Sequence, residues 1–288
     1  MRASPRLSTI NSMGTGSRIQ AQDQGAVRKS AVALVALAAA LACCCAPAFA
    51  SKARPSVHET TLEDPNQKTP ELATDELKAL LAKGGAVLLD ARPTEEYALA
   101  HIPGSLNLDE KQLGRFTQSF PDRNISIVVY SNGPYCERAR DKSEDLLRLG
   151  YTRISRYQLG LPVWRALGNT AETNLQGFRQ VLRDGNTFVV DARSRTEYAA
   201  GTVPGALAIL AGEVSKAEKD RRLRYLDHST RVIVFAGSTA EARTVADELA
   251  RNAYSNTSYF DGSYAELKRA KFFSERRPSA ADLDDFTK

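Results

Sequence analysis

The chain contains an internal repeat, and this repeat restricts the possible folds more than any other feature of the sequence. The segment VLLDARPTEEYALAHIPGSLNL begins at Val87, and the related segment FVVDARSRTEYAAGTVPGALAI begins 101 residues later at Phe188. A period of this length is too long for a solenoid unit, so the repeat predicts two copies of one domain. Identical residues at this spacing include Asp90 and Asp191, Arg92 and Arg193, Glu96 and Glu197, Tyr97 and Tyr198, Pro103 and Pro204, and Gly104 and Gly205.

Each copy of the repeat is surrounded by short apolar segments that alternate with helical patterns. The first copy has expected strands at 86–90, 125–130 and 153–158, and expected helices at 74–83, 94–99 and 137–149. The second copy has expected strands at 187–191, 231–235 and 257–260, expected helices at 175–185, 196–200 and 244–252, and an expected loop at 236–243. Short apolar strands that alternate with helices predict an α/β fold, in which each module has a mainly parallel sheet with helices on both faces.

The N-terminal segment at 1–50 has the pattern of a secretory signal peptide. Arg28 and Lys29 precede an apolar run that ends at the tripeptide AFA (48–50). Cleavage there would leave Ser51 as the first residue of a periplasmic or secreted protein. The apolar run is about 15 residues long, whereas a membrane span needs roughly 20, so an uncleaved anchor is the weaker interpretation.

Removal of this segment changes what the composition implies. The formal net charge is +5 for the whole chain and +1 for residues 51–288, because the first 50 residues carry five basic side chains and one acidic one. The mature chain therefore has no excess of basic residues, and we find no basic stripe with interleaved aromatic residues. These properties argue against binding of nucleic acid.

The cysteines give a second consequence of cleavage. Loss of Cys43, Cys44 and Cys45 would leave Cys136 as a lone thiol, so no internal disulfide could form. Lipidation of Cys43 or Cys44 is the alternative to cleavage and would anchor the protein in the cell envelope; membrane association is expected only in that case. The scattered histidines and the single cysteine give no metal-ligand spacing, so we expect no metal and no cofactor.

The first copy of the repeat resembles the signature of the rhodanese family. The segment DARPTEEYALAHIPGSLN has the signature residues Asp90, Arg92, Glu96, Tyr97, His101, Ile102, Pro103 and Gly104 in place. The second copy keeps most of them but has Thr202 where the histidine would be. The resemblance implies a tandem of rhodanese-like modules of the sulfurtransferase superfamily. We divide the chain into a signal peptide at 1–50, a linker at 51–69, a first module at 70–168, a degenerate second module at 173–272 and a polar tail at 273–288.

The resemblance also implies a position for the nucleophile, and neither module has a cysteine there. In active rhodaneses, a cysteine directly after the strand that corresponds to 125–130 takes a sulfane sulfur as a persulfide, which the N–H groups of the following loop hold. This position is Ser131 in the first copy and Ala236 in the second. A serine hydroxyl is a weak nucleophile without an adjacent base, and no histidine lies in or beside the loop, so we expect Ser131 to start the loop and bond local backbone.

Cys136 is the remaining candidate for a reactive thiol. It closes the loop SNGPYC (131–136) just before the expected helix, where unpaired N–H groups, the helix dipole and Arg138 favour a thiolate. The loop is similar to a rhodanese variant of the form C-N-G-P-x-C, in which Cys136 corresponds to the second cysteine. The alternative is a small, half-buried residue at a helix start. The predicted binding loop comprises Ser131, Asn132, Gly133, Pro134, Tyr135 and Arg138.

The acidic and basic residues of the signature are expected to be structural. We interpret Asp90 with Arg92, and Asp191 with Arg193, as buried pairs that brace the loops from below.

Two hypotheses of function follow. The first is an exported rhodanese-like protein without the usual nucleophile, which binds an oxyanion, a sulfur carrier or a partner protein. The second is a sulfurtransferase of the thiosulfate or persulfide type that works through Cys136. The partner in either case would be a sulfur-carrying small molecule or protein, and the absence of cysteine at position 131 favours the first hypothesis.

Overall fold

The computed structural model describes residues 56–63, 67–109, 112–223 and 229–270, which belong to one compact unit that starts at Pro55. The predicted signal peptide, its cleavage at Ser51, the lipidation positions Cys43 and Cys44 and the polar tail lie outside the described residues. Within the described ranges, no helix is both long enough and apolar enough to cross a membrane.

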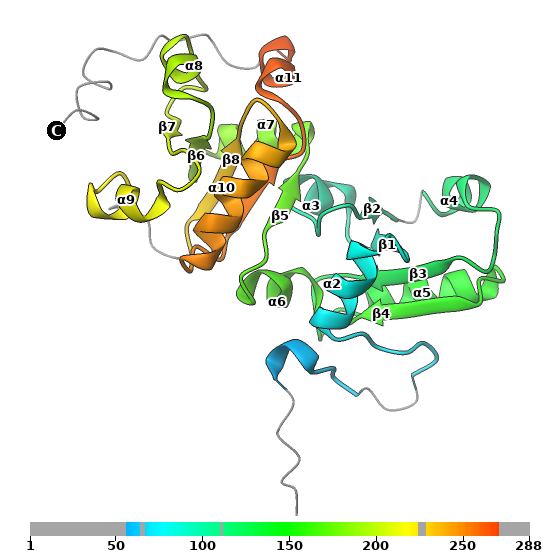
Figure 1. Ribbon diagram of the computed structural model, residues 1–288. Coiled ribbons are helices and arrows are strands. Elements are labelled where there is room, and N and C mark those ends of the chain that lie inside the picture. The colour runs from blue at the N-terminus through cyan, green and yellow to red at the C-terminus, as the bar shows by residue number, and fades with distance from the viewer. Residues whose placement is uncertain (1–55, 64–66, 110–111, 224–228, 271–288) are drawn as a thin grey trace, which may run out of the picture. The chain divides into compact units, whose positions relative to one another are not determined.

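The first module is built on a parallel sheet with the strand order β2-β1-β3-β4 (Figure 1). Its strands are β1 (Val87–Asp90), β2 (Leu106–Asn107), β3 (Ser126–Tyr130) and β4 (Arg153–Tyr157). Its helices are η2 (Val57–Glu59), α2 (Thr74–Ala82), α3 (Thr94–Leu99), α4 (Leu113–Ser119), α5 (Arg138–Arg148) and α6 (Gly160–Ala166).

Helices cover both faces of this sheet, because successive strand residues point to opposite sides. Leu88 of β1 lies in a core with Leu77 of α2 and Trp164 of α6. Its neighbour Leu89 lies in a second core with Leu146 of α5. The apolar strands that the sequence shows are therefore buried on both sides, as the α/β prediction requires.

The second module repeats this arrangement with one more strand, in the order β5-β9-β8-β6-β7. All of its strand pairs are parallel. Its strands are β5 (Ala171–Thr173), β6 (Thr187–Asp191), β7 (Leu207–Ala208), β8 (Arg231–Phe235) and β9 (Thr257–Phe260). Its helices are α7 (Leu175–Asp184), α8 (Arg195–Ala199), α9 (Val214–Lys219), α10 (Thr239–Arg251) and α11 (Tyr264–Arg269).

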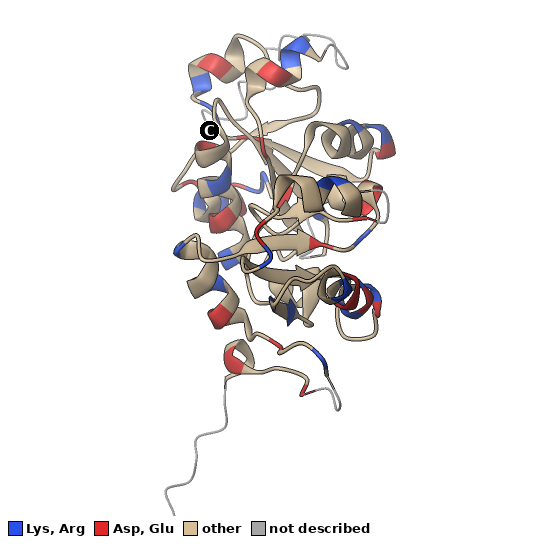
Figure 2. Ribbon diagram, turned by 90° about the vertical axis from the view of Figure 1, so that its right-hand side faces the viewer, with Lys and Arg blue, Asp and Glu red and all other residues tan. Residues whose placement is uncertain are grey.

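The second sheet is also covered on both faces. Val190 of β6 packs in a core with Val245 of α10. Val189 packs in a core on the other face, with Phe178 of α7 and Leu267 of α11. On the side of the molecule shown in Figure 2, basic and acidic residues are intermixed along the helices.

Both modules present the loops of interest at corresponding positions. Asp90 pairs in register with Tyr130, and Asp191 pairs with Phe235, at the carboxyl ends of neighbouring parallel strands. Ser131 and Ala236 directly follow these strands, so the two loops are topologically equivalent, as the repeat predicts.

The two modules are in contact through α3 and α7. A Cβ atom added to Gly177 of α7 would lie 1.9 Å from the carbonyl oxygen of Ala98 in α3, so only glycine allows the backbones to approach so closely. Beside this contact, His101 and Glu172 form an antiparallel bridge, and their side chains approach to 3.4 Å.

Two local predictions differ from the structure. The expected loop at 236–243 is mostly helix, because Ser238 caps α10 at its start and its side chain accepts a hydrogen bond from the Glu241 amide. The predicted modules at 70–168 and 173–272 leave residues 169–172 outside both. The structure instead has β5 there, which pairs with β9 as an edge strand of the second sheet.

Candidate functional site

The candidate site is the loop between β3 and α5. Ser131 at its start is buried, with 2% of its surface exposed, whereas Tyr135 near its end is fully exposed. Cys136 is partly exposed and free. The loop therefore runs from the interior, at the carboxyl end of β3, out to the surface and back to the start of α5.

The conformation of the loop depends on two glycines. Gly133 has a φ of +102°, and Gly160, the first residue of α6, has a φ of +66°; side chains are disfavoured at both values. A Cβ atom at Gly160 would lie 2.4 Å from the amide nitrogen of Gly133 and 2.5 Å from the carbonyl oxygen of Ser131. The start of α6 thus packs directly against the loop, and the Leu161 amide donates to that same Ser131 oxygen at 3.2 Å.

Polar groups of the loop affect the ionisation of the Cys136 thiol. Burial opposes ionisation of this thiol, but the Ser131 hydroxyl, the Arg138 and Asn132 amides and the positive charge of Arg138 together outweigh it. Together they lower the pKa of Cys136 below its ordinary value.

Ser131 is poorly arranged to act as a nucleophile. Its hydroxyl donates to the Cys136 carbonyl oxygen at 3.5 Å, a long distance for a hydrogen bond. Among the described residues, none of the contacts of Ser131 involves a histidine or a carboxylate that could take its proton. Its hydroxyl instead bonds the backbone of Cys136 and contributes to the lowered pKa of that thiol.

Asn132 is held from outside the loop by a residue of the repeated signature. Its side-chain amide donates to Glu96 of α3 at 2.6 Å. Glu96 is available for this contact because Pro93, at the start of α3, makes no side-chain cap. Asn132 is thereby linked to the helix that follows β1.

The buried pair of Asp90 and Arg92 lies beneath the loop. The Arg92 guanidinium donates to both Asp90 oxygens, with Nη2 at 2.6 Å, and to the Ala100 carbonyl. Tyr130, the residue before the loop, donates its hydroxyl to Asp90 at 2.6 Å. The pair reaches the loop through Tyr130, and bracing of the loop by this pair stays a prediction.

The second module keeps the buried pair but lacks the rest of the site. Arg193 donates to Asp191 and to the Gly201 carbonyl in the same manner. Ala236 has no functional group, and α10 begins three residues after it at Thr239. The second module thus has the equivalent strand end and buried pair, but it has no thiol and only a short loop before α10.

A cavity of about 450 Å³ adjoins the loop of the first module. Pro134, Tyr135 and Cys136 form one side of it. The segment 67–69 and Arg140 line it as well, and Lys68 is paired with Glu144 at 2.8 Å. A molecule in this cavity would contact the thiol and charged side chains of both signs.

Several site residues were not identified from the sequence. Glutamate is present at the same position of both repeats, as Glu96 and Glu197, and this identity could have indicated that Glu96 has a role. No feature of the segment 67–69 indicates that it lies at the same cavity as the thiol. The sequence also gives no sign of the role of Gly160, because its contact with Gly133 depends on how the start of α6 and the loop are brought together.

Comparison with known proteins identifies the modules. The family model described as "Rhodanese-like domain" matches residues 73–167 and 175–270. The human thiosulfate:glutathione sulfurtransferase is 32% identical over 111 residues, which cover 38% of this chain and 88% of that protein. An HTH-type transcriptional regulator of Mycobacterium tuberculosis is 36% identical over 86 residues, which cover 30% of this chain and 37% of the regulator.

Solved structures give more distant similarity. A thiosulfate sulfurtransferase from Pseudomonas aeruginosa is 23% identical with a TM-score of 0.33, over 74% of this chain and 46% of that one. The structure of wild-type EanB is 18% identical with a TM-score of 0.34, over 73% of this chain and 62% of EanB. This chain thus spans less than half of the regulator and of the Pseudomonas enzyme.

Proposed function

Because this chain belongs to the rhodanese-like family, with two tandem domains of the sulfurtransferase superfamily, we propose that its first module accepts sulfane sulfur at Cys136. The observation that supports this proposal is a free, partly exposed thiol in the wall of a cavity of about 450 Å³, whose pKa is lowered by the Ser131 hydroxyl and the Asn132 and Arg138 amides. These donors stabilise a thiolate, and they remain in position to stabilise the negative charge of a persulfide.

The chemistry that follows is a simple displacement. The Cys136 thiolate attacks the outer sulfur of thiosulfate, a new S–S bond forms, and the S–S bond of thiosulfate breaks. The electron pair of the broken bond leaves with sulfite. An acceptor thiolate or cyanide then removes the outer sulfur and regenerates the Cys136 thiolate, so no further oxidant or reductant is needed.

Mass analysis after treatment with thiosulfate tests this proposal. Trypsin should release residues 124–138 as a peptide in which Cys136 is the single cysteine, so the result is independent of Cys43, Cys44 and Cys45. We expect this peptide to gain the mass of one sulfur atom and to lose it on treatment with cyanide. An unchanged peptide after treatment with both thiosulfate and polysulfide would contradict the proposal.

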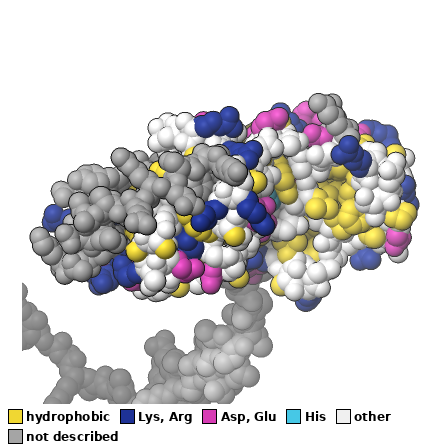
Figure 3. Space-filling model, turned by 90° about the horizontal axis from the view of Figure 1, so that it is seen from above, with side chains coloured by type: hydrophobic (Ala, Val, Ile, Leu, Met, Phe, Trp, Pro, Cys, Tyr) yellow, Lys and Arg dark blue, Asp and Glu magenta, His cyan; other side chains and the backbone are white. Residues whose placement is uncertain are grey.

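A second candidate is a protein that binds an oxyanion, a sulfur carrier or a partner protein without transferring sulfur. It is favoured by Ser131 and Ala236, which stand where the family carries its cysteine. The exposed large apolar side chains of the described part include Leu106 and Tyr135, and Figure 3 shows apolar side chains gathered on one face. Thiosulfate binding that persists in Cys136→Ala, together with no mass gain in the wild type, would favour this candidate.

We also propose export, on the basis of the signal-peptide pattern at 1–50. The protein would then act in the periplasm or outside the cell, or on the envelope membrane if Cys43 or Cys44 is lipidated. N-terminal sequencing of the mature protein should give Ser51. An intact Met1 or Met13 on a cytosolic protein would contradict both versions.

A further inference from the structure

The second module holds the end of helix α3 of the first module. The Asn174 amide donates to the Ala98 carbonyl at 3.2 Å. The Thr173 hydroxyl, at the end of β5, donates to the Leu99 carbonyl at 2.8 Å. In the first turn of α7, Gly177 approaches the Ala98 carbonyl so closely that no side chain would fit between them. The last residues of α3 are thus fixed against β5 and α7 of the second module.

The segment that follows α3 is held in the same way. His101 and Glu172 exchange two main-chain hydrogen bonds of 2.9 and 2.8 Å, and the Glu172 carboxylate accepts from the Gly104 amide at 2.9 Å. Leu99 packs against the core of the second module, while Ala171 of β5 lies in a core of the first. Because each module contributes an apolar side chain to the core of the other, their separation would expose apolar surface to water.

The same stretch of chain also contacts the loop between β3 and α5. Glu96 of α3 accepts a hydrogen bond from the Asn132 side chain at 2.6 Å. The Ile102 amide donates at 2.9 Å to the hydroxyl of Tyr130, the residue directly before the loop. Residues 96–104 therefore have hydrogen bonds both to the second module and to the loop and its supporting strand.

The position of Asn132 affects the thiol at the end of the loop. Burial raises the pKa of Cys136, but the Ser131 hydroxyl and the Arg138 and Asn132 amides lower it to below the ordinary value. A displacement of α3 would remove the contact of Glu96 with Asn132 and so loosen one of these groups. The pKa of Cys136 should then rise toward its ordinary value, and less thiolate would be present at neutral pH.

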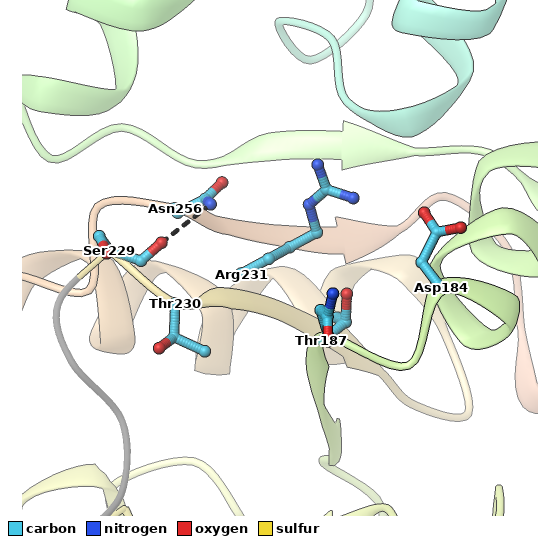
Figure 4. Close-up of a pocket in the computed structure, with 7 residues that line it drawn as sticks. Asp184, Thr187, Ser229, Thr230, Arg231 and Asn256 are labelled. Atoms are coloured by element: carbon cyan, nitrogen blue, oxygen red, sulfur yellow. Dashed lines mark hydrogen bonds between the residues drawn. The ribbon is translucent and has the colours of Figure 1, made fainter.

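The contact with α3 is made at one end of the second sheet, the carboxyl end of β5. Figure 4 shows a cavity of about 620 Å³ at the amino-terminal ends of β6 and β8, lined by Thr187 and Arg231 among others. All strand pairs of this sheet are parallel, so the cavity is at the opposite end, and it shares no residue with the contact segment 171–177. The cavity is therefore not part of the contact with α3.

We propose that the second module positions the reactive loop of the first: residues 171–177 hold α3, and α3 with the residues that follow it holds Asn132 and Tyr130. This inference rests on the proposed function, because it gives the second module, which has no thiol of its own, a role in the reactivity of the thiol that accepts sulfur. Thr173 and Gly177 are positioning residues, since they act through α3 and contact no substrate.

The pH dependence of Cys136 alkylation by iodoacetamide in the full chain tests this proposal, with the tryptic peptide 124–138 as the readout. Gly177→Ala forces α3 and α7 apart, and Thr173→Val removes one hydroxyl with little change of volume, so the second variant should fold even if the first does not. We expect the half-maximal pH to rise by about half a unit, which makes alkylation at neutral pH roughly threefold slower. If either folded variant keeps the half-maximal pH of the wild type, the proposal is wrong.

Two variants within the second module are matched controls. Thr257→Val removes a buried hydroxyl that donates to the Tyr254 carbonyl at 2.6 Å, a bond that does not involve the first module. Gly262→Ala places a Cβ atom 1.9 Å from the Glu266 carboxylate, as close as the contact that Gly177→Ala creates. Both controls should lower the unfolding temperature and leave the half-maximal pH unchanged. Equal shifts in the controls and the test variants would mean that a general loss of stability explains the result, and would overturn the proposal.

A double-variant cycle tests the route through Glu96. Glu96→Ala already removes the contact of α3 with Asn132, so Gly177→Ala should shift the half-maximal pH less in this background than in the wild type. Equal shifts in the two backgrounds would contradict the proposal. Alkylation needs no sulfur transfer, so the two proposals fail separately: shifted variants without a mass gain from thiosulfate contradict only the proposed function, and a mass gain without shifted variants contradicts only the positioning role.

Discussion

The two modules use the same signature aspartate and arginine but complete the hydrogen bonds of the aspartate differently. In the first module, Asp90 accepts from the hydroxyl of Tyr130, which comes from the neighbouring strand. In the second, Phe235 occupies that strand position and has no hydroxyl, and Thr202 donates to Asp191 at 2.6 Å instead. Thr202 stands where the first module has His101, so two substitutions that look unrelated in the sequence compensate one another.

The signature glutamate also differs between the modules. Glu197 bonds the amide and hydroxyl of Ser194 and forms a capping box at the start of α8. Glu96 has Pro93 at the equivalent position and bonds Asn132 of the loop instead. The same signature glutamate therefore has different contacts in the two modules. In the second module it only caps a helix, whereas in the first it contacts the loop that ends with the thiol.

The largest expected effect comes from removal of the buried aspartate in each module. Asp90→Ala and Asp191→Ala each leave a buried arginine without its partner and should cost about 3–5 kcal/mol of unfolding free energy. Only Asp90→Ala should also change the rate at which iodoacetamide alkylates Cys136, because Asp90 is linked to the loop through Tyr130. Chemical denaturation and alkylation kinetics measure the two effects, and an equal change of alkylation in both variants would contradict the comparison.

A smaller effect is expected from Gly160→Ala. The new Cβ atom would lie 2.4 Å from the Gly133 amide, so the loop must shift, at a cost of roughly 1–3 kcal/mol in stability. Gly168→Ala is the matched control, because Gly168 also has a positive φ, of +76°, but its nearest neighbouring atom would be 3.9 Å away. We expect Gly168→Ala to be less destabilising and to leave Cys136 alkylation unchanged. Equal loss of stability and unchanged alkylation in both variants would show that the close contact has no influence on the loop.

The pH dependence of the thiols compares the two loops directly. In the wild type, alkylation of Cys136 should reach half its maximal rate below the pH of about 8.5 that is usual for cysteine. Ser131→Ala removes a donor to the thiolate and should raise the pKa, so the reaction at neutral pH should be slower by up to roughly tenfold for one pKa unit. A half-maximal pH that stays the same in Ser131→Ala would exclude a contribution of this hydroxyl.

New cysteines at the position that the family normally uses extend this test. Ser131→Cys in a Cys136→Ser background should restore persulfide formation, because the loop donors and the pair of Asp90 and Arg92 are retained. Ala236→Cys should gain less, since α10 begins close to it and the second module has no such loop. Mass analysis after treatment with thiosulfate measures persulfide formation in both variants. An equal yield of persulfide would mean that the longer loop does not contribute to its formation.

The smallest expected effect separates the two roles of the glutamate. Glu197→Ala should lower stability by about 1 kcal/mol through loss of a helix cap, without altering Cys136. Glu96→Ala should have a similar or smaller effect on stability but should change the alkylation rate of Cys136, because Asn132 loses its 2.6 Å contact. If the alkylation rate of Cys136 is unaltered in Glu96→Ala, Glu96 has only a structural role, as Glu197 does.

The repeat carries most of the information that made the fold predictable. Buried strands and their flanking helices followed from short apolar runs, and the equivalence of Ser131 and Ala236 followed from their positions after such runs. The start of α10 was missed because Ser238 and Glu241 form a capping box inside a segment that looked like a loop. Lys68 and Cys136 line the same cavity although they lie in distant segments of the chain, and no local sequence pattern encodes this.

Strand β5 has a consequence for the order in which the protein is assembled during synthesis. It leaves the ribosome directly after the first module, yet its neighbour in the sheet is β9, near the end of the described chain. Glu172 of β5 accepts from the Gly104 amide of the first module and from the Tyr259 hydroxyl of β9. The first module can form early, but the edge at β5 stays unpaired until almost all of the second module has emerged, which makes this short strand the place where a chaperone or a second nascent chain would gain access.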